Sequence, residues 1–365
     1  MLPEPAQNRD YPELARQIKA WARDLGFSGA TIGRAELPAE VGQRLLDWLA
    51  AGHHGEMDYM ARHGLLRARP AELVPGALSV VSVRLPYRDP AARDMHAVLA
   101  DGDKAAIARY ALGRDYHKTV RNRLQKLADR LHAAAGPLGY RVFSDSAPLM
   151  EVALAAQSGL GWRGKHTLLI HRDEGSFFFL GELLTDLPLP ADAPVDAHCG
   201  RCTRCLDVCP TQAIVAPYQV DARRCISYHT IELRGPIPQE FRRAVGNRIY
   251  GCDDCQLVCP WNRFAQPSGE PDFRVRHGLD APRLIELFGW DEAKFLRRTE
   301  GSAIRRIGHE RWLRNIAVAL GNAPRSVAVV VALQGRMAHP SALVREHVAW
   351  ALTEQASKPV DTSGL

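Results

Sequence analysis

Residues 199–210 read CGRCTRCLDVCP, in which four cysteines have the spacing C-x2-C-x2-C-x3-C-P, at Cys199, Cys202, Cys205 and Cys209. A second run, GCDDCQLVCP at residues 251–260, repeats the last three cysteines of that spacing at Cys252, Cys255 and Cys259. One further cysteine, Cys225, lies between the two runs. All the cysteines of the chain therefore belong to one segment, and they need one explanation.

This spacing is typical of domains that hold two 4Fe–4S clusters, in which three thiolates bind one cube and the fourth reaches the other cube. The second run is one ligand short, because Ile249 stands where a complete run would have its first cysteine. Cys225 is the remaining cysteine and supplies the missing ligand. The predicted ligand sets are Cys199, Cys202, Cys205 and Cys259 for the first cluster, and Cys209, Cys225, Cys252 and Cys255 for the second.

Zinc sites and disulfides are the alternatives for these cysteines. Structural zinc also takes four cysteines, but usually as C-x2-4-C pairs, which the x2, x2, x3, Pro run does not resemble. The start of the chain lacks a charged segment followed by an apolar one, so we expect no secretory signal and a cytoplasmic protein. In a reducing compartment disulfides are rare, which favours iron–sulfur clusters.

The bulk composition allows a soluble protein of two or three domains. The chain has 365 residues, of which 46% are hydrophobic, and a formal net charge of +6. No apolar run approaches the ~20 residues of a membrane helix, so no membrane association is expected. The longest apolar run, SVAVVVAL at 326–333, is predicted to be a buried helix. A mildly basic balance is by itself weak support for a nucleic-acid partner.

The cysteine segment divides the chain into three predicted domains, at residues 1–195, 196–268 and 269–365. The first mixes helical and strand periodicities, which indicates an α/β or α+β domain around a mostly buried sheet. Leu14, Ile18, Trp21 and Leu25 share one face of a helix. The expected elements are helices at 11–26 and 117–136, strands at 78–87 and from 140, and a hairpin of TLLIH and SFFFLGELL at 167–171 and 176–184.

The third domain is predicted to be helical. Within it RNIAVAL at 314–320 resembles EHVAWAL at 346–352. This offset favours a short HEAT-like helical repeat, although it is below the usual ~40 residues. Two ordinary helices of one bundle are the alternative that the sequence leaves open.

Several long motifs together resemble the epoxyqueuosine reductases, over the region from about Gly52 to Ala323. They are RYALGRDYHK, FSDSAPLMEVALAAQSGLGWRGKHTLLI, CGRCTRCLDVCPTQAI, DARRCISYHTIELRG, GNRIYGCDDCQLVCPWN and EGSAIRRIGHERWLRNIAVALGNAP.

The resemblance implies an α+β multidomain enzyme with an α/β cobalamin-binding domain, a ferredoxin-like two-cluster domain and a HEAT-like domain that helps to bind tRNA. It implies reduction of epoxyqueuosine to queuosine at the wobble position of tRNA, the last step of queuosine synthesis. Clusters pass electrons, and a low-potential pair could drive cobalamin to a strongly nucleophilic state. The implied partners are the modified tRNA and an external electron donor such as a flavodoxin or ferredoxin, and we expect a monomer.

By the same resemblance, Asp145 in FSDSAP is the proton donor for the departing epoxide oxygen. The alternative is a helix N-cap, because Ser144, Asp145 and Ser146 precede a helix-like stretch. Further cofactor contacts carry over at Arg67, Ala108, Leu169, Leu180 and Ser227, with Lys165 as a contact to the cofactor or the RNA. The apolar members of this set would otherwise be core residues, and Arg67 a surface ion pair.

Many cobalamin proteins donate an axial histidine from a D-x-H-x-x-G loop. Two stretches begin this way, at Asp115 and Asp196, but Val120 and Arg201 stand where the glycine should be. We therefore predict that no histidine ligates the cobalt.

Basic residues gather in three runs. Residues 105–126 hold six basic side chains against one acid, residues 223–248 hold six against two, and Arg305, Arg306, Arg311 and Arg314 are opposed by Glu310. Such runs suit phosphate binding, although most are solvated helix faces. Guided by the resemblance, we predict that Arg234, Arg305 and Arg306 contact the tRNA anticodon arm, whose wobble base must leave its stack.

Two other functions compete. A corrinoid reductase of the reductive dehalogenase kind would use the same cofactors on small halogenated molecules, but such enzymes are normally exported behind a twin-arginine signal. A non-catalytic electron-transfer or RNA-binding module would leave the first domain without a purpose.

Overall fold

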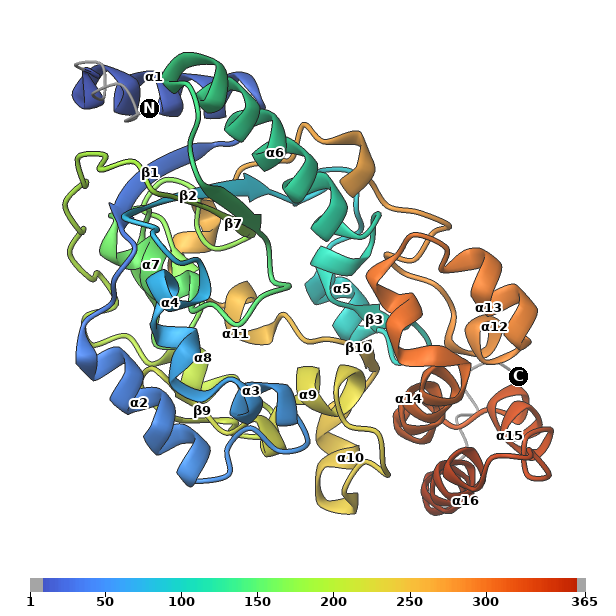
Figure 1. Ribbon diagram of the computed structural model, residues 1–365. Helices are drawn as coiled ribbons and strands as arrows, with labels where there is room; N and C mark the ends of the chain where they lie inside the picture. Colours follow the sequence, from blue (N-terminus) through green and yellow to red (C-terminus); the bar gives the residue numbers. More distant parts are fainter. Residues whose placement is uncertain (1–8, 360–365) are drawn as a thin grey trace.

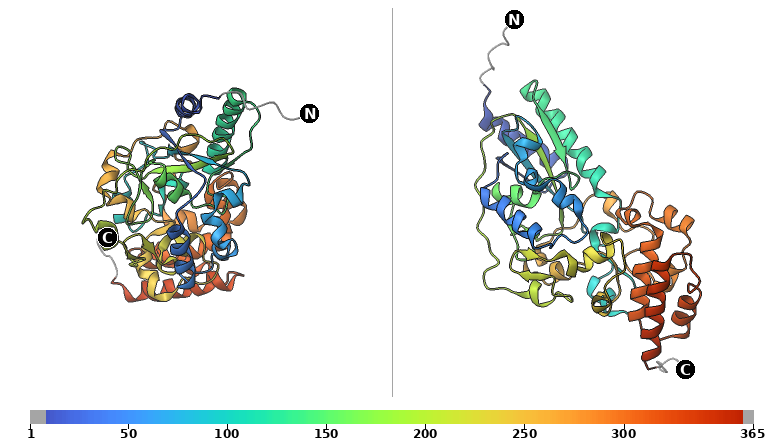
Figure 2. Two further views of the ribbon diagram at one scale, coloured as in Figure 1. Left: turned by 60° about the vertical axis from the view of Figure 1, so that its left-hand side comes forward. Right: turned by 60° about the horizontal axis from the view of Figure 1, so that its bottom comes forward.

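The protein is described here as a computed structural model that covers residues 9–359. Residues 1–8, which begin the first predicted domain and the stretch from which no secretory signal was expected, lie outside the described part. So do residues 360–365, which end the third predicted domain. The α+β part and the C-terminal helices lie at opposite ends of the molecule, and the cysteine segment packs beside both (Figures 1 and 2). Within the described residues, no helix is long and apolar enough to span a membrane.

A four-stranded antiparallel sheet organises the first part. Its order is β1-β2-β7-β4, with bounds Gly29–Arg34, Ser79–Pro86, Phe178–Thr185 and Tyr140–Phe143. Every residue of β2 is buried, as expected of a strand paired on both edges. Because all pairings in this sheet are antiparallel, the first part is α+β in the strict sense, and the α/β description of the cobalamin domain was wrong for its sheet.

Helices cover both faces of this sheet. On one face lie α1 (Tyr11–Asp24) and α6 (Tyr116–Ala135), as predicted; Leu14 and Ile18 are buried, whereas Trp21 and Leu25 are only partly so. Asp115 caps the start of α6, where its side chain accepts the His117 N–H, and Gly136 caps its end with a φ of 76°, which suits glycine. The other face is covered by α7 (Glu151–Gln157), α2 (Ala39–Ala50) and α4 (Pro70–Leu73). The short α3 (Asp58–Arg62) follows α2.

The predicted hairpin of TLLIH and SFFFLGELL does not form. Strand β6 (Leu169–Ile170) pairs with β5 (Trp162–Arg163), while β7 pairs with β2 and β4. A bridge joins His171 to Gly175, which lies in the turn before the second segment. Strand β2 pairs with the whole of β7 and β4 with its last four residues, whereas β6 pairs with β5.

The cysteine segment is built from short elements: α8 (Arg204–Asp207), β8 (Ile214–Ala216), β9 (Gln219–Val220), α9 (Ile226–Ile231), α10 (Gln239–Val245), β10 (Arg248–Tyr250) and α11 (Asp254–Leu257). Strand β10 pairs with β3 (Ala106–Ile107), which follows α5 (Met95–Ala100) in the first part. Ile107 and Leu112 also enter the core of the C-terminal helices. The three parts of the chain are thus tied together by residues that are distant in sequence.

The last part is helical, as predicted. Its helices are α12 (Leu284–Phe288), α13 (Glu292–Arg298), α14 (Gly308–Asn322), α15 (Val327–Gln334) and α16 (Ala342–Ser357). The similar segments 314–320 and 346–352 lie on α14 and α16, which pack closely enough for Gly321 to face Ala351. A HEAT-like repeat stays a prediction. The buried helix expected at 326–333 was wrong in part, because α15 buries Val329 and Leu333 but leaves Val327 82% exposed.

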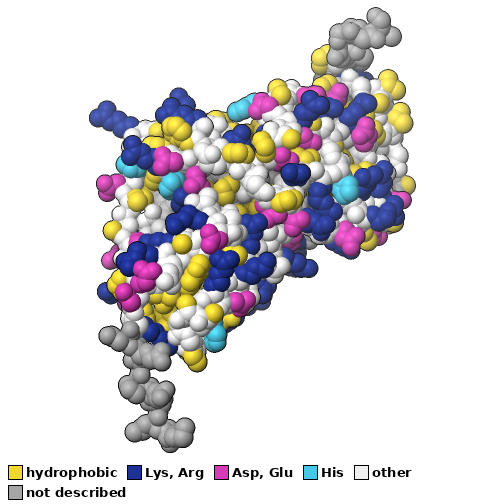
Figure 3. Space-filling model, turned by 90° about the horizontal axis from the view of Figure 1, so that it is seen from above, with side chains coloured by type: hydrophobic (Ala, Val, Ile, Leu, Met, Phe, Trp, Pro, Cys, Tyr) yellow, Lys and Arg dark blue, Asp and Glu magenta, His cyan; other side chains and the backbone are white. Residues whose placement is uncertain are grey.

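Most of the basic residues counted above have structural partners. Four in the run 223–248 form ion pairs, namely Arg223 with Asp221, Arg242 with Glu346, Arg243 with Glu354 and Arg248 with Asp254. On the face shown in Figure 3, lysines and arginines are interspersed with carboxylates. Arg314 is fully buried, so its place in the third predicted patch was wrong.

Arg314 instead joins the helical layer to the cysteine segment. Its guanidinium donates hydrogen bonds to the carbonyl oxygens of His229, Leu233 and Gly235 at 2.5, 2.8 and 2.7 Å. Burial lowers the pKa of Arg314 to about 9, yet the group stays protonated at neutral pH.

We expect Arg314→Met to lower the free energy of unfolding by about 3 kcal/mol or more, because three buried carbonyl groups lose their donor. Urea unfolding followed by circular dichroism measures this change. The exposed Arg305→Met variant is the control and should stay within about 0.5 kcal/mol of the parent protein. Equal stability of the two variants would contradict the bridging role.

Candidate active site

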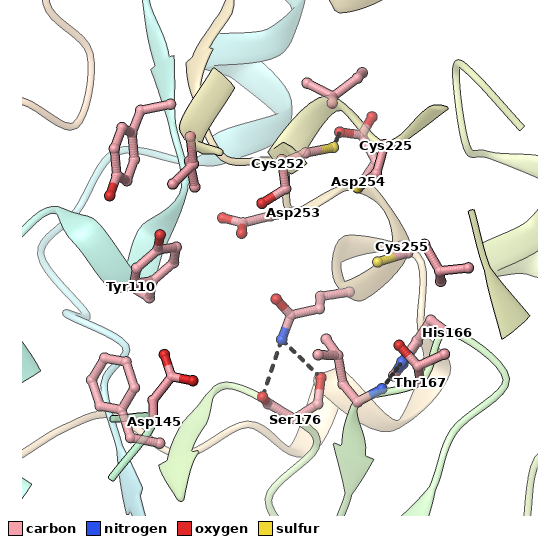
Figure 4. Close-up of a pocket in the computed structure, with 18 of the residues that line it drawn as sticks. Tyr110, Asp145, His166, Thr167, Ser176, Cys225, Cys252, Asp253, Asp254 and Cys255 are labelled. Carbon is pink, nitrogen blue, oxygen red and sulfur yellow. Dashed lines mark hydrogen bonds between the residues drawn. The ribbon is translucent and has the colours of Figure 1, made fainter. Parts of the chain in front are cut away.

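A cavity of about 480 Å³ lies where the three parts of the chain meet. It is bounded by the start of α6, by strands β6 and β7, by the cysteine segment and by Arg306. Apolar side chains, including Val152, Phe178 and Ile214, form much of its wall. Figure 4 shows Asp145 facing Cys252 and Cys255 across this space.

The thiols form two groups that match the predicted ligand sets in composition. Cys209, Cys225, Cys252 and Cys255 line the cavity, and none of the other four does. We call these the inner group. Burial raises the pKa of Cys255 well above its ordinary value, and the nearby Cys225 raises it further.

The outer group is Cys199, Cys202, Cys205 and Cys259. Burial, and then the neighbouring Cys199, Cys259 and Cys202, raise the pKa of Cys205 to about 11. Buried sulfurs this close together ionise only beside a cation, so both groups suit iron rather than free thiolates. Within residues 9–359, no three His, Cys, Asp or Glu side chains are grouped to hold a single metal ion.

Asp145 lies on the loop after β4 with a φ of 52°, an uncommon conformation for a residue other than glycine. Its carboxylate accepts a hydrogen bond from the Tyr116 hydroxyl, and its backbone N–H donates to Glu151 Oε1 at 2.7 Å. The side chain is 63% exposed. Helix α7 begins at Glu151 without any side-chain cap, so the alternative of Asp145 as an N-cap is wrong.

Tyr116 and His117, which the residue-by-residue reading did not single out, complete this corner of the cavity. His117 Nδ1 lies 2.6 Å from Asp115 Oδ1, and its Nε2 lies 3.7 Å from Asp145 Oδ2. Burial alone would lower the pKa of His117, but the hydrogen bond and charge of Asp115 and the charge of Asp145 raise it above its ordinary value. Both residues belong to the DYH triplet of the RYALGRDYHK motif, which is the sequence feature that could have indicated them.

The predicted cofactor contacts divide into two sets. Leu169, Leu180 and Ser227 line the cavity together with Asp145. Arg67 and Ala108 are buried outside its lining; Arg67 donates to the carbonyl oxygens of Tyr59 and Met60.

Lys165 is not brought to the cavity either. Its ammonium donates to the carbonyl oxygens of Gly200 and Cys202 at 2.8 and 2.9 Å. Lys165 therefore holds the loop that carries the outer group.

The cavity suits a large, flat, mostly apolar group with polar edges, such as a corrin. The lining supports this fit, because Leu169, Leu180 and Phe178 lie beside the polar side chains of Ser227 and Asp145. Burial lowers the pKa of His166, which also lines the cavity, to about 4. The prediction that no histidine ligates cobalt stays a prediction.

Of the three predicted tRNA contacts, Arg306 lines the cavity and also pairs with Glu232 at 2.8 Å. Arg234 and Arg305 are exposed. Half-buried Arg311 lies close enough to both Arg306 and Arg234 for their charges to lower its pKa after burial does. Arg306 thus joins the cavity wall to a neighbouring group of positive charges that includes Arg311 and Arg234.

Comparison with known proteins agrees with this site. Residues 198–262 match the family described as 4Fe-4S double cluster binding domain, and residues 67–146 match Epoxyqueuosine reductase QueG, DUF1730. An epoxyqueuosine reductase of Pseudomonas aeruginosa is 58% identical over 357 residues, which cover 96% of this chain and 98% of that protein. The chain belongs to the epoxyqueuosine reductase family.

Solved epoxyqueuosine reductases share the fold. A crystal structure with an epoxyqueuosine-modified tRNA-Tyr stem loop has a TM-score of 0.85 and 28% identity, covering 95% of this chain and 91% of that one. Another, from Bacillus subtilis, has its catalytic aspartate loop swung out of the active site, with a TM-score of 0.84, 28% identity and the same coverage.

Beneath the Asp145 loop lies a pair of acids that sequence reasoning missed. Glu182 on β7 is fully buried and has no hydrogen-bond donor for either carboxylate oxygen among the described residues. Burial, and then the charge of Glu151, raise its pKa well above the ordinary value. Burial, and then the charge of Asp145, raise the pKa of Glu151 to about 7. Burial and the neighbouring Glu151 thus both favour the neutral form of Glu182.

We expect Glu182→Gln to become more stable relative to the parent protein as the pH rises from 5 to 8. A carboxyl whose pKa is raised on folding binds more protons in the native state. Its contribution to the stability of the fold is therefore lost as the pH rises above its pKa in the unfolded chain, about 4.3. Glutamine keeps the shape and a donor but cannot ionise.

The thermal midpoint at pH 5 and at pH 8 tests this expectation. The difference in unfolding free energy should grow by up to about 1.4 kcal/mol per pH unit. The exposed Glu240→Gln variant is the control and should show no such trend. A difference between Glu182→Gln and the parent that is independent of pH would contradict the raised pKa of Glu182.

Proposed function

We propose that this protein reduces the epoxide of epoxyqueuosine to the alkene of queuosine at the wobble position of tRNA. One observation carries the proposal: four cluster-type thiols and the loop carboxyl of Asp145 face each other across one cavity, whose wall also includes Arg306. The reaction consumes two electrons and two protons and releases the epoxide oxygen as water. The family assignment favours this substrate over small halogenated molecules.

The eight thiols would hold two 4Fe–4S clusters, one per group. The inner group lines the cavity, so its cluster would deliver electrons there, and the outer group would pass electrons to the inner one. Leu169, Leu180 and Ser227 would contact cobalamin. Cobalamin, when bound, supplies a strongly reducing and nucleophilic cobalt for opening a strained ring.

The protein's own residues would supply the proton chemistry. Asp145 is exposed to the cavity, and the hydrogen bonds from the Tyr116 hydroxyl and to Glu151 hold its carboxyl and backbone in place. Asp145 would protonate the departing oxygen. His117, paired with Asp115, stands close enough to return a proton to Asp145 in the next cycle.

The tRNA would approach over Arg234, Arg305 and Arg306. Arg306 lies in the cavity wall, so a phosphate beside the wobble nucleotide would be held where the base enters. Reaching the cavity requires an unstacked base, which favours recognition of the anticodon loop over a duplex. A HEAT-like α14–α16 layer would support these arginines, and a monomer acting in the cytoplasm is our expectation.

We expect Asp145→Asn to slow queuosine formation by about 10²- to 10⁴-fold, the usual contribution of a positioned acid. The measurement is mass spectrometry of nucleosides from epoxyqueuosine-containing tRNA after dithionite reduction of the cobalamin-loaded protein. Cluster absorption and tRNA affinity should be unchanged. The exposed Asp129→Asn variant on α6 is the control, and a loss below about threefold in Asp145→Asn would remove its assigned role.

The double variant Arg305→Ala/Arg306→Ala should bind tRNA more weakly and with a flatter dependence on salt, because fewer phosphate contacts release fewer counterions. The slope of log affinity against log salt should fall by about 1 to 2. Filter binding between low and moderate salt measures it, with Lys126→Ala on α6 as the control. Unchanged affinity and slope would exclude these arginines from the interface.

A further inference from the structure

A second hollow of about 860 Å³ lies on the molecule, and it shares no lining residue with the cavity described above. We call it the basic cleft. Its walls come from α5, α8, the end of α11 and the turn that follows Cys259. The lining residues used below are Arg88, Asp94, Arg109, Arg204, Asp207, Val208, Leu257, Val258, Cys259, Pro260 and Arg263.

The basic cleft opens onto the outer group of thiols. Cys259 is part of its lining, and Arg204, Asp207 and Val208 come from the same run as Cys202 and Cys205. No member of the inner group lines it. The two predicted clusters therefore face different spaces, the inner one the cavity and the outer one the basic cleft.

The charged side chains of the basic cleft are mostly arginines, and their charges are not paired with carboxylates of the described residues. Among these residues, the guanidinium groups of Arg88 and Arg109 donate to the carbonyl oxygens of Ala265 and Arg93, at 3.1 and 2.8 Å. Arg204 and Arg263 are exposed and, within residues 9–359, form no ion pair with a carboxylate. The two acids are already engaged: Asp94 caps α5, and Asp207 accepts the Thr203 hydroxyl at 2.8 Å.

Apolar surface accompanies these charges. Val208, Leu257, Val258 and Pro260 line the basic cleft. Next to it, Arg263 stacks over the ring of Phe264, which is 38% exposed. An apolar centre with arginines around it is the composition of protein–protein contact surfaces.

We propose that the basic cleft docks a small acidic redox protein that reduces the cluster of the outer group. This inference rests on the proposed function, because a reductase needs a source of electrons. Each encounter moves one electron from the reduced carrier to the outer cluster and leaves the carrier oxidised; two encounters supply both electrons of one turnover. Unpaired arginines steer a partner of opposite charge and speed its association.

The test uses the full-length, cluster-loaded protein and a reduced flavodoxin of net negative charge as the probe. The double variant Arg204→Glu/Arg263→Glu reverses two charges at residues that do not line the cavity formed beside the inner group. The control, Arg121→Glu/Lys126→Glu, makes the same charge change on the exposed face of α6. Calorimetry measures binding of oxidised flavodoxin, and stopped-flow absorbance measures cluster reduction.

In the cleft variant, flavodoxin binding and the rate of cluster reduction at low salt should each fall at least about tenfold. Dithionite-driven queuosine formation and tRNA affinity should match the parent protein. The control should keep both flavodoxin readouts.

Unchanged flavodoxin binding and reduction in the cleft variant would overturn the proposal. Weakened tRNA binding with intact flavodoxin binding would also overturn it, and would make the cleft an RNA surface. If the parent protein forms no queuosine even with dithionite, the proposed function fails instead, while flavodoxin binding still decides the docking.

Discussion

Crowding of cysteine sulfur is the constraint on which this structure depends. Burial and neighbouring sulfurs raise the pKa values of Cys205 and Cys255, because thiolates this close together would repel one another. Iron would compensate the negative charge of the thiolates and link residues from two runs that are far apart in the chain. The inner group then becomes one wall of the cavity, and the rest of the site is positioned relative to it.

The opposite wall depends on a second constraint, the left-handed backbone at Asp145. Such a conformation persists only where its surroundings hold it. The Tyr116 hydroxyl approaches the side chain from α6, and Glu151 accepts the backbone N–H from α7. Glu182 supports Glu151 from the sheet beneath. Two neighbouring acids can lie there because one of them stays neutral, which gives the loop a polar support without two buried charges.

The two hollows divide the chemistry between them. The cavity combines an apolar wall, a proton-donating corner and the inner thiols, whereas the basic cleft combines unpaired arginines with the outer thiols. Substrate and electron donor would then act from separate surfaces, so neither has to leave before the other binds. Buried Arg314 keeps the helical layer fixed against the segment that carries the cysteines.

Features that depend on neighbours in the chain were predictable from the sequence. The two cysteine runs, the helix α6 and the strand β2 each follow from local spacing or periodicity, because covalent connection places those residues together in any fold. The motif FSDSAP likewise located Asp145.

Only the tertiary structure decided which distant residues meet. Strand β7 pairs with β2 and β4, and β6 pairs with β5, so the expected hairpin does not form. Several basic residues form internal ion pairs, because the fold places acids from other segments beside them. The pairing of Glu151 with Glu182, the burial of Arg314 and the exposure of α15 follow from packing between elements separated by tens of residues. The order of residues along the chain does not specify these contacts, which depend on how the hydrophobic faces of distant elements pack.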